Sequence, residues 1–541
     1  MKVLVLGGVA AGTKIAAKLM REDRGNEVTI LNKGENISYA GCGLPYYVGH
    51  VIERQDELIV NTPEKYEKLT GVKVLTGTEA VKVDPAGKTV TAKNLASGEE
   101  TVYPYDKLVI AVGASAAKPP IEGVDKENVF VMRTPADAIR LRALVDGGEI
   151  KRAVVVGGGY IGLEIAENLK AMGVKPFVLD MAPHILQPGF DPEMAEYVEG
   201  KLLEAGIPTV TGVTVTAIEG GEKAEKVLTS KKPYKADLVV LAAGIRPNTD
   251  FLADTGIEMV RGAIVTDEMG RTSLPDVYAA GDCAMVKNAI TGEAAYSPMG
   301  STANIAGRAI AQNMMGKDLP YRGVLGTAVC KLPGINVGRT GLTVEMAKQA
   351  GFDPESVITV VDDKAHYYEG ASTFVIKMIA DRKTERLLGV QVIGSGAVDK
   401  IVDIAVTGIT LKGTLRDLAD MDLAYAPPFS TAIHPFEHTL NVLRNKLAGV
   451  FETITPAEFL EGKAEGYRII DTCLIPSIEG VPYVEMTEVN GPVAGLDPEE
   501  KLLLVCNKGK RAYLLQNRLK YYGYKNTRVL EGGITFNDVE A

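Results

Sequence analysis

Short apolar runs, glycine turns and amphipathic stretches follow one another twice along the chain. The first series has an apolar run at residues 2–6, a glycine turn, a stretch with helical apolar spacing at 13–20, and a second apolar run at 27–31. Short apolar runs bounded by turns are typical of buried parallel strands, and apolar residues recurring at i, i+3 and i+4 are typical of a helix. The pattern therefore predicts a strand–helix–strand unit at the start of the chain.

The same pattern recurs from residue 153, with an apolar run, a helical stretch and a strand that ends at Asp180. Here the turn carries all three glycines of GxGxxG, namely Gly157, Gly159 and Gly162. After a strand and before a helix, this spacing favours dinucleotide binding over a merely structural turn. The Asp180 carboxylate is placed to bind a ribose 2′-hydroxyl and would repel a 2′-phosphate, so NADH is favoured over NADPH.

The first unit has a less regular glycine turn. Gly7, Gly8 and Gly12 are present, but Val9 stands at the middle glycine position, and the second strand is followed by the uncharged Asn32. Glycines let the backbone approach a pyrophosphate, whose charge the helix N-terminus stabilises. Two such units imply two dinucleotides, or a flavin dinucleotide and a nicotinamide.

Three further apolar runs end in glycine and read as buried strands. The first two runs flank the second unit, where the chain is expected to cross from one domain to the other. The third run ends in a Gly-Asp pair, whose aspartate can accept hydrogen bonds from a ribityl chain. The residues at these strand ends are Gly113, Gly244, Gly281 and Asp282.

Composition narrows the functional class. With a net charge of -10 and a pI near 5.3, the chain has no basic excess to offset phosphate charge, which argues against a nucleic-acid partner or an anionic membrane surface. No apolar run approaches the ~20 residues of a membrane span. The 5 cysteines show no metal-binding spacing, so we expect no metal site, and dispersed free thiols suit the cytoplasm.

A third chemical motif lies near the C-terminus. The apolar run 502–505 is followed by CxxGxR, from Cys506 to Arg511, and then by a helical stretch. Backbone amides, Lys508, Lys510 and Arg511, together with the helix N-terminus, would surround the sulfur with positive potential and stabilise a thiolate or persulfide.

This tail resembles a rhodanese domain, and the resemblance implies that Cys506 carries sulfane sulfur. The chain departs from the family at residues 471–473, where Asp-Thr-Cys stands for the usual Asp-Val-Arg. The departure puts thiosulfate sulfur transfer in doubt more than persulfide carriage, and a purely structural rhodanese domain stays an alternative. Cys473 is interpreted as a buried residue at a strand end rather than a second reactive thiol.

Residues 1–449 resemble the flavoprotein disulfide reductases that have two dinucleotide-binding domains. The two glycine-turn units, the Gly281-Asp282 pair and the Ala-Tyr-Ala-Pro-Pro-Phe-Ser segment at 424–430 carry the resemblance. It implies FAD in the first unit, the nicotinamide in the second, and a C-terminal dimerisation domain that makes a homodimer. At the position of Asn32 the family usually has a glutamate that binds the adenosine ribose of FAD, so FAD affinity is expected to be lower.

The segment 38–47 resembles the single-cysteine branch of that family, in which Cys42 lies beside the flavin. Glutathione-reductase-like enzymes have a second cysteine five positions on, where this chain has Tyr47, so Cys42 needs a foreign sulfur or an oxygen as its redox partner. The resemblance implies coenzyme A as that thiol. We expect the helix that begins near Gly43 to lower the pKa of Cys42.

The resemblance also implies further site residues. Tyr367 and Tyr425 match positions that reach the active cysteine in coenzyme A-disulfide reductases, where a phenol could protonate a leaving thiolate. Tyr368 is an alternative to Tyr367, and both could instead be buried interface aromatics. The residues expected to bind substrate are Arg21, Ser38 and Arg511, although Arg21 could equally be solvated surface charge.

The fold class that follows is α/β, with two Rossmann-like dinucleotide-binding domains, an α+β dimerisation domain and a C-terminal α/β rhodanese-like domain. The expected boundaries are 1–113 with 245–322 for FAD, 114–244 for NAD(H), 323–449 for dimerisation, and 453–541 for the rhodanese-like domain.

Three functions are compatible with this architecture. The first is an NADH-dependent, coenzyme A-linked reductase of a small-molecule sulfur substrate: persulfide, polysulfide or coenzyme A disulfide. The second is an NADH oxidase or peroxidase that cycles Cys42 through a sulfenic acid, and the third is a non-catalytic flavin redox sensor. The fused tail favours the first, because oxygen reduction has no use for a sulfur carrier.

Overall fold

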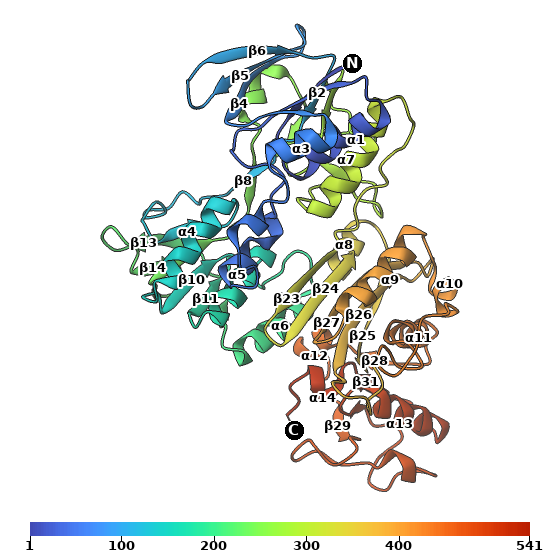
Figure 1. Cartoon of the computed structure of the whole chain (residues 1–541). Coiled ribbons are helices and arrows are strands. Elements are labelled where there is room, and N and C mark those ends of the chain that lie inside the picture. Colours follow the sequence, from blue (N-terminus) through green and yellow to red (C-terminus); the bar gives the residue numbers. More distant parts are fainter. Residues whose placement is uncertain (541) are drawn as a thin grey trace. The chain divides into compact units, whose positions relative to one another are not determined.

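The computed structural model describes residues 1–540 and divides into two compact units (Figure 1). One unit comprises residues 1–183 and 207–324, and the other comprises residues 184–206 and the chain from residue 325 onward. Both are mixed α/β, as the sequence predicts. Within residues 1–540, every helix is too short or too polar to cross a bilayer.

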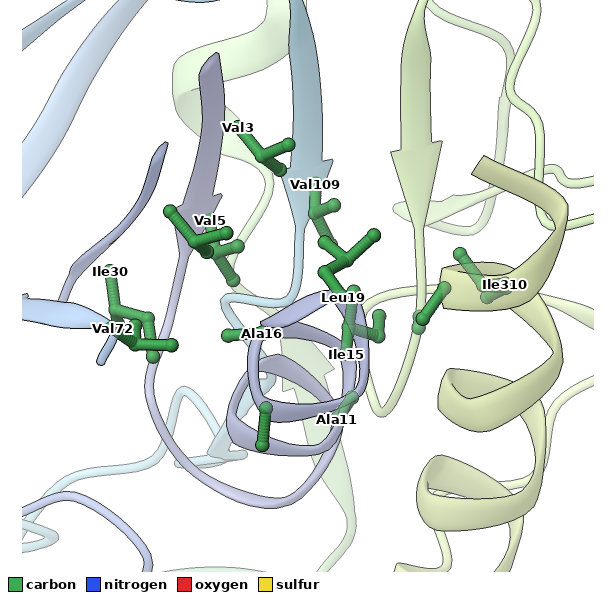
Figure 2. Close-up of a cluster of buried hydrophobic side chains, with 14 of the residues drawn as sticks. Val3, Val5, Ala11, Ile15, Ala16, Leu19, Ile30, Val72, Val109 and Ile310 are labelled. Carbon is green, nitrogen blue, oxygen red and sulfur yellow. The ribbon is translucent and has the colours of Figure 1, made fainter. Parts of the chain in front are cut away.

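The first unit contains a parallel sheet of order β20-β7-β1-β2-β3. Helix α1 packs against α7, and their apolar side chains meet β1 in a core that includes Val5, Ile15, Leu19 and Ile310 (Figure 2). The bounds are β1 Lys2–Leu6, α1 Ala10–Glu22, β2 Glu27–Leu31, β3 Lys73–Leu75, β7 Lys107–Ile110, β20 Val277–Ala279 and α7 Gly300–Met314.

A second parallel sheet of the same unit has the order β12-β11-β10-β16-β9. Helix α5 follows β10, and the short helix α2 packs against both α4 and α5. The bounds are α2 Leu44–Val48, β9 Val129–Val131, α4 Pro135–Asp146, β10 Arg152–Val156, α5 Tyr160–Ala171, β11 Lys175–Leu179, β12 Thr209–Val210 and β16 Leu238–Leu241.

Two small antiparallel sheets, each of three strands, accompany the parallel ones. Their bounds are β4 Thr78–Asp84, β5 Thr89–Asn94, β6 Glu100–Pro104, β13 Val215–Glu219, β14 Lys226–Thr229 and β15 Tyr234–Lys235. Helix α3 (Pro63–Thr70) begins at a Thr62 cap, whose hydroxyl accepts the Lys65 N–H.

The second unit is built on an antiparallel sheet of order β23-β24-β27-β26-β25, against which α9 and α11 pack. Helix α6 belongs to this unit too: Lys377 of β26 pairs with Glu193 and Asp191 at the start of α6. The bounds are α6 Pro192–Glu204, β23 Ala328–Leu332, β24 Ile335–Gly341, α8 Val344–Gln349, β25 Pro354–Asp362, β26 Thr373–Asp381, β27 Leu387–Gly394, α9 Val398–Thr410, α10 Leu415–Ala419 and α11 Pro435–Leu447.

The end of the chain forms a parallel four-stranded sheet of order β28-β31-β30-β29, with α13 packed on β30 and β31. Its core contains Leu503, Val505 and Leu530, all fully buried. The bounds are β28 Thr453–Ile454, α12 Pro456–Leu460, β29 Arg468–Asp471, β30 Leu502–Val505, α13 Lys510–Tyr521, β31 Thr527–Leu530 and α14 Gly533–Phe536.

Candidate active site

Both glycine turns lie between a buried strand and a helix that is open to an anion. Within residues 1–540, no side chain caps α1 or α5, and neither helix has an acidic residue in its first turn. Gly157 has φ +115, and a Cβ there would lie 2.3 Å from the Ala242 carbonyl oxygen. A Cβ on Gly159 would meet open space. This open, uncapped turn fits a pyrophosphate approaching the backbone.

Asn32 and Asp180 occupy equivalent places in the two units. The Asn32 Oδ1 accepts the Gly8 N–H at 2.9 Å, and the Asp180 Oδ2 accepts the Gly158 N–H at 2.6 Å. Asp180 also accepts the Ala182 N–H at 2.7 Å, whereas the Asn32 amide donates to the carbonyls of residues 34 and 36. Each side chain thus stabilises its glycine turn by a hydrogen bond, but only Asp180 places a negative charge beside the turn.

The remaining glycines predicted to bind cofactor follow strands of the two parallel sheets. Gly113 and Gly244 have φ of +65 and +102, and Gly281, with φ +79, lies two residues after the end of β20. Asp282 is next, and its Oδ2 lies 2.6 Å from an Arg133 guanidinium nitrogen. The sequence did not single out Arg133, because it lies 149 residues away along the chain.

Cys42 is an exposed free thiol in a single 3₁₀ turn (Gly41–Gly43) that leads into α2. Its pKa is raised, first by partial desolvation of the sulfur and then by the charges of Glu164 and Asp282, whereas the charge of Arg133 lowers it. The expectation that the helix N-terminus lowers this pKa is therefore wrong. Helix α2 is only 5 residues long, too short to offset desolvation and two carboxylates.

Ser38 and Arg21 are the residues of the first unit that are expected to bind substrate. Ser38 is hydrogen-bonded to the first glycine turn. Its backbone N–H donates to the Gly8 carbonyl at 3.0 Å, and its φ of +49 is the left-handed conformation. Arg21 is exposed in the last turn of α1. Both assignments stay predictions.

In the second unit, Tyr367 and Tyr425 lie together. A hydrogen bond between the two phenols raises the pKa of Tyr425. Both side chains are more than half exposed, as is Phe429. The alternative of aromatics buried in a dimer interface stays a prediction, because these exposed fractions are those of a single chain.

Cys506 lies at the beginning of α13, at the carboxyl end of β30. Its Sγ accepts backbone N–H groups from Gly509 at 3.2 Å and Ala512 at 3.4 Å. The thiol is 2% exposed. Amides at a helix N-terminus favour a negatively charged sulfur, which is what a persulfide carrier requires.

Two of the three cations of this loop make ion pairs with carboxylates instead of bonding to the sulfur, and Lys510 is exposed. Arg511 binds Glu485 at 2.9 Å and the Thr472 carbonyl at 2.9 Å, and Lys508 pairs with Asp362 at 2.5 Å. The positive potential expected from these side chains is thus partly neutralised, and the backbone amides are the direct ligands of the sulfur.

The other cysteines and His434 have structural places. Burial and a hydrogen bond to Asp471 raise the pKa of the fully buried Cys473 to about 12. Cys283 and Cys330 are buried. His434 is buried and caps α11 through Nδ1, which accepts the Phe436 N–H.

A half-buried carboxyl of the first unit, Glu164, could not be recognised from the sequence. Glu164, in the second turn of α5, accepts a hydrogen bond from the Tyr46 hydroxyl at 3.2 Å. Burial raises its pKa to about 7. The one signal in the sequence was a charged residue two positions after the last glycine of GxGxxG, in an otherwise apolar run.

Comparison with family models divides the chain as its motifs do. Residues 1–306 match the model described as pyridine nucleotide-disulphide oxidoreductase, residues 327–435 match the dimerisation domain of that family, and residues 443–535 match the rhodanese-like domain.

Relatives of known activity include two kinds of enzyme. The chain is 36% identical over 444 residues to a NAD(P)H coenzyme A polysulfide/persulfide reductase from Pyrococcus horikoshii, a match that covers 82% of this chain and 98% of that one. It is 34% identical over 450 residues to an NADH oxidase from Methanocaldococcus jannaschii, covering 82% and 100%.

Solved structures also match the chain over nearly its full length. The NAD-dependent persulfide reductase from A. fulgidus superposes with a TM-score of 0.94 at 35% identity, covering 99% of this chain and 100% of that one. The match therefore includes the C-terminal domain, which the relatives above do not cover.

Proposed function

Since the chain belongs to the pyridine nucleotide-disulphide oxidoreductase family, we propose that it is an NADH-dependent FAD enzyme that reduces persulfide, polysulfide or coenzyme A disulfide. Its working intermediate is a mixed disulfide between Cys42 and coenzyme A. A rhodanese-like domain that carries sulfane sulfur on Cys506 completes the enzyme.

The residues of the chain hold two dinucleotides in this scheme. The turn at 7–12 and the Gly281-Asp282 pair bind FAD, and the turn at 157–162 with Asp180 binds NADH. When bound, FAD supplies the route by which the two electrons of NADH reach a disulfide. Asp180 disfavours NADPH, because its carboxylate would face the 2′-phosphate.

Cys42 performs the sulfur chemistry. Its thiolate attacks one sulfur of the disulfide or persulfide, the S–S bond breaks, and the leaving thiolate or sulfide takes up a proton. The exposed pair of Tyr367 and Tyr425 supports a role for a phenol as a proton donor to that leaving group. The cysteine is then regenerated by reduction of the new mixed disulfide.

The single observation that carries this proposal is the N–H cradle around Cys506. A sulfur held by two backbone amides at the N-terminus of α13 suits a persulfide anion. Reduction of oxygen or peroxide uses no sulfur carrier, so the cradle favours a sulfur substrate.

Steady-state assays separate the candidate activities. The enzyme is expected to turn over polysulfide, coenzyme A persulfide or coenzyme A disulfide faster than peroxide. Cys42→Ser should abolish all these activities. Cys506→Ser should leave the reduction of coenzyme A disulfide unchanged and should slow the reduction of a sulfane-sulfur donor.

Fastest turnover of peroxide would instead favour the oxidase or peroxidase function. A Cys42→Ser protein that loses all NADH oxidation yet keeps its cellular role would favour a redox sensor.

Mass spectrometry of the purified protein tests the identity of the thiol. We expect coenzyme A in disulfide linkage to Cys42, lost on treatment with NADH. Another adduct, or an unmodified Cys42 in the oxidised protein, would contradict a coenzyme A mixed disulfide.

The matched dimerisation domain supports a homodimer. Tyr425, Phe429 and Ile433 leave more than half of each side chain exposed, an aromatic and apolar surface that a second copy of the chain would cover. Light scattering during size-exclusion chromatography should give twice the chain mass of 57.7 kDa.

We also propose a cytoplasmic location, which is supported by the five free thiols among the described residues.

A further inference from the structure

Glu164 is a half-buried carboxyl to which the chemistry above assigns no task. It lies in α5, two residues after the glycine turn expected to bind NADH. Among residues 1–540, no lysine or arginine is paired with it, and it accepts a hydrogen bond from the Tyr46 hydroxyl at 3.2 Å. A carboxyl without a cation in a desolvated place is a candidate for proton transfer.

Tyr46 connects this carboxyl to the helix that carries the reactive thiol. Cys42 lies in the 3₁₀ turn Gly41–Gly43, and Tyr46 lies four residues further on, in the adjoining α2. Helices α2 and α5 approach closely, since a Cβ on Gly49 would lie 2.0 Å from the Asn168 Oδ1. The hydrogen bond between Tyr46 and Glu164 is therefore supported by the close packing of α2 on α5.

Electrostatic interactions also couple the titration of Glu164 to Tyr46 and to Cys42. Burial raises the pKa of Glu164 to about 7, the Tyr46 hydrogen bond lowers it, and the charge of Glu167 raises it. The Glu164 charge in turn raises the pKa of Cys42. The groups facing Glu164 are thus Tyr46 from α2, Cys42 from the turn before it, and Glu167 from α5 itself.

Reduction of a disulfide needs a proton that NADH does not bring. The balance is RSSR′ + NADH + H⁺ → RSH + R′SH + NAD⁺. As the S–S bond breaks, one sulfur leaves as an anion, and it needs a nearby acid whose pKa is close to the working pH.

We propose that Glu164, acting through Tyr46, holds this proton for the sulfur chemistry at Cys42. When the mixed disulfide at Cys42 is reduced, the Tyr46 O–H bond breaks and an S–H bond forms on the released sulfur. Tyr46 then takes the proton of Glu164, whose O–H bond breaks, and the carboxylate is protonated again from solvent. Glu164 is a positioning residue in this scheme, because it acts through Tyr46. The inference rests on the reductase function proposed above and adds its proton source.

The first test is the pH dependence of kcat with saturating NADH and coenzyme A disulfide. In the wild-type holoenzyme, kcat should fall as pH rises through about 7, where Glu164 loses its proton. Glu164→Gln should lack this fall, with kcat lowered about 100-fold at pH 6 and KM unchanged. Tyr46→Phe should also lower kcat, and its residual fall should move to higher pH, since Glu164 loses the bond that lowers its pKa.

The second test needs no sulfur substrate, so it separates failure of this inference from failure of the reductase proposal. Iodoacetamide labels Cys42 in the NADH-reduced holoenzyme across a pH series, and mass spectrometry measures the labelled fraction. Glu164→Gln should move the labelling midpoint to lower pH, because it removes a negative charge near the thiolate. Glu149→Gln, an exposed carboxylate before β10, is the charge-matched control and should leave the midpoint in place.

An unchanged labelling midpoint in Glu164→Gln, or a kcat that still falls above pH 7 in that variant, would overturn the inference. Because glutamine is isosteric with glutamate, either result would assign Glu164 a structural role alone.

Discussion

At the scale of single residues, Asn32 and Asp180 perform the same structural task with different charge. Each accepts the second N–H of its glycine turn. Asn32 also donates to two carbonyls, which a carboxylate could not do, so the turn at 32–36 explains why an amide stands there. The structure thus gives a local reason for the departure that the sequence registered only as weaker FAD binding.

Asp180 is predicted to set the choice of nicotinamide. Asp180→Asn removes the carboxylate charge while keeping the size of the side chain, so KM for NADPH should fall and KM for NADH should rise. We expect the ratio of the two kcat/KM values to change by about tenfold, equivalent to about 1.4 kcal/mol. Steady-state kinetics with both nucleotides measure it, and an unchanged ratio would remove Asp180 from the nicotinamide site.

His434 is predicted to make stability depend on pH. Burial, together with Lys400, lowers its pKa to about 4 from the ordinary 6.5. The unfolded chain therefore binds the proton first, so the contribution of His434 is complete above pH 6.5 and is lost as pH falls toward 4. Urea midpoints measured from pH 7 to 4 should fall less in His434→Asn, which keeps an N-cap acceptor that does not titrate. Parallel curves for the two proteins would contradict this.

At the scale of elements, each dinucleotide unit depends on a helix that lies very close to its strand. A Cβ on Gly162 would lie 1.9 Å from the Gly157 carbonyl oxygen, and Gly12 stands in the same relation to Gly7. The colliding atoms are backbone, which cannot move aside as a flexible side chain can. These glycines therefore serve packing, whereas Gly159 meets open space where a ligand can approach.

Gly162→Ala should push α5 away from the turn. We expect a loss of about 1–3 kcal/mol in stability and weaker NADH binding, because overpacking displaces the helix N-terminus. Gly200→Ala, in the exposed face of α6 where the new methyl meets nothing within 4 Å, is the control and should stabilise slightly. Thermal unfolding and NADH titration report both effects, and equal behaviour of the two variants would refute the packing argument.

At the scale of the whole molecule, the C-terminal domain is fastened to the dimerisation domain within the second unit. Glu531, 2% exposed at the end of β31, accepts the Ile358 N–H at 2.8 Å and pairs with Lys446 at 2.7 Å. The Lys508–Asp362 pair adds a second link. These contacts join the end of β31 and the loop that contains Cys506 to the sheet of the dimerisation domain.

Breaking this link should loosen the C-terminal domain. Glu531→Gln leaves the buried Lys446 without its main counter-charge, and loss of one partner of a buried pair costs about 3–5 kcal/mol. Glu499→Gln, which breaks an exposed pair with Lys525, should change stability by less than about 1 kcal/mol. Calorimetry and limited proteolysis near residue 450 measure the difference, and equal proteolysis rates would show that Glu531 does not hold the domains together.

The sequence alone determined the parts of this protein that depend on neighbouring residues. Strand–turn–helix order, the glycine turns, the lone Cys42 and the loop at Cys506 could all be predicted, because turn geometry and apolar periodicity are local properties. These also sufficed for the fold class and for the resemblance to the family.

Only the tertiary structure decided what depends on contacts between distant segments. The raised pKa of Cys42, the Tyr46–Glu164 contact across 118 residues and the packing of α6 on the second unit could not be predicted. The physical reason is that desolvation and charge–charge energies depend on which segments fold against one another, and that no local pattern along the chain encodes those distances.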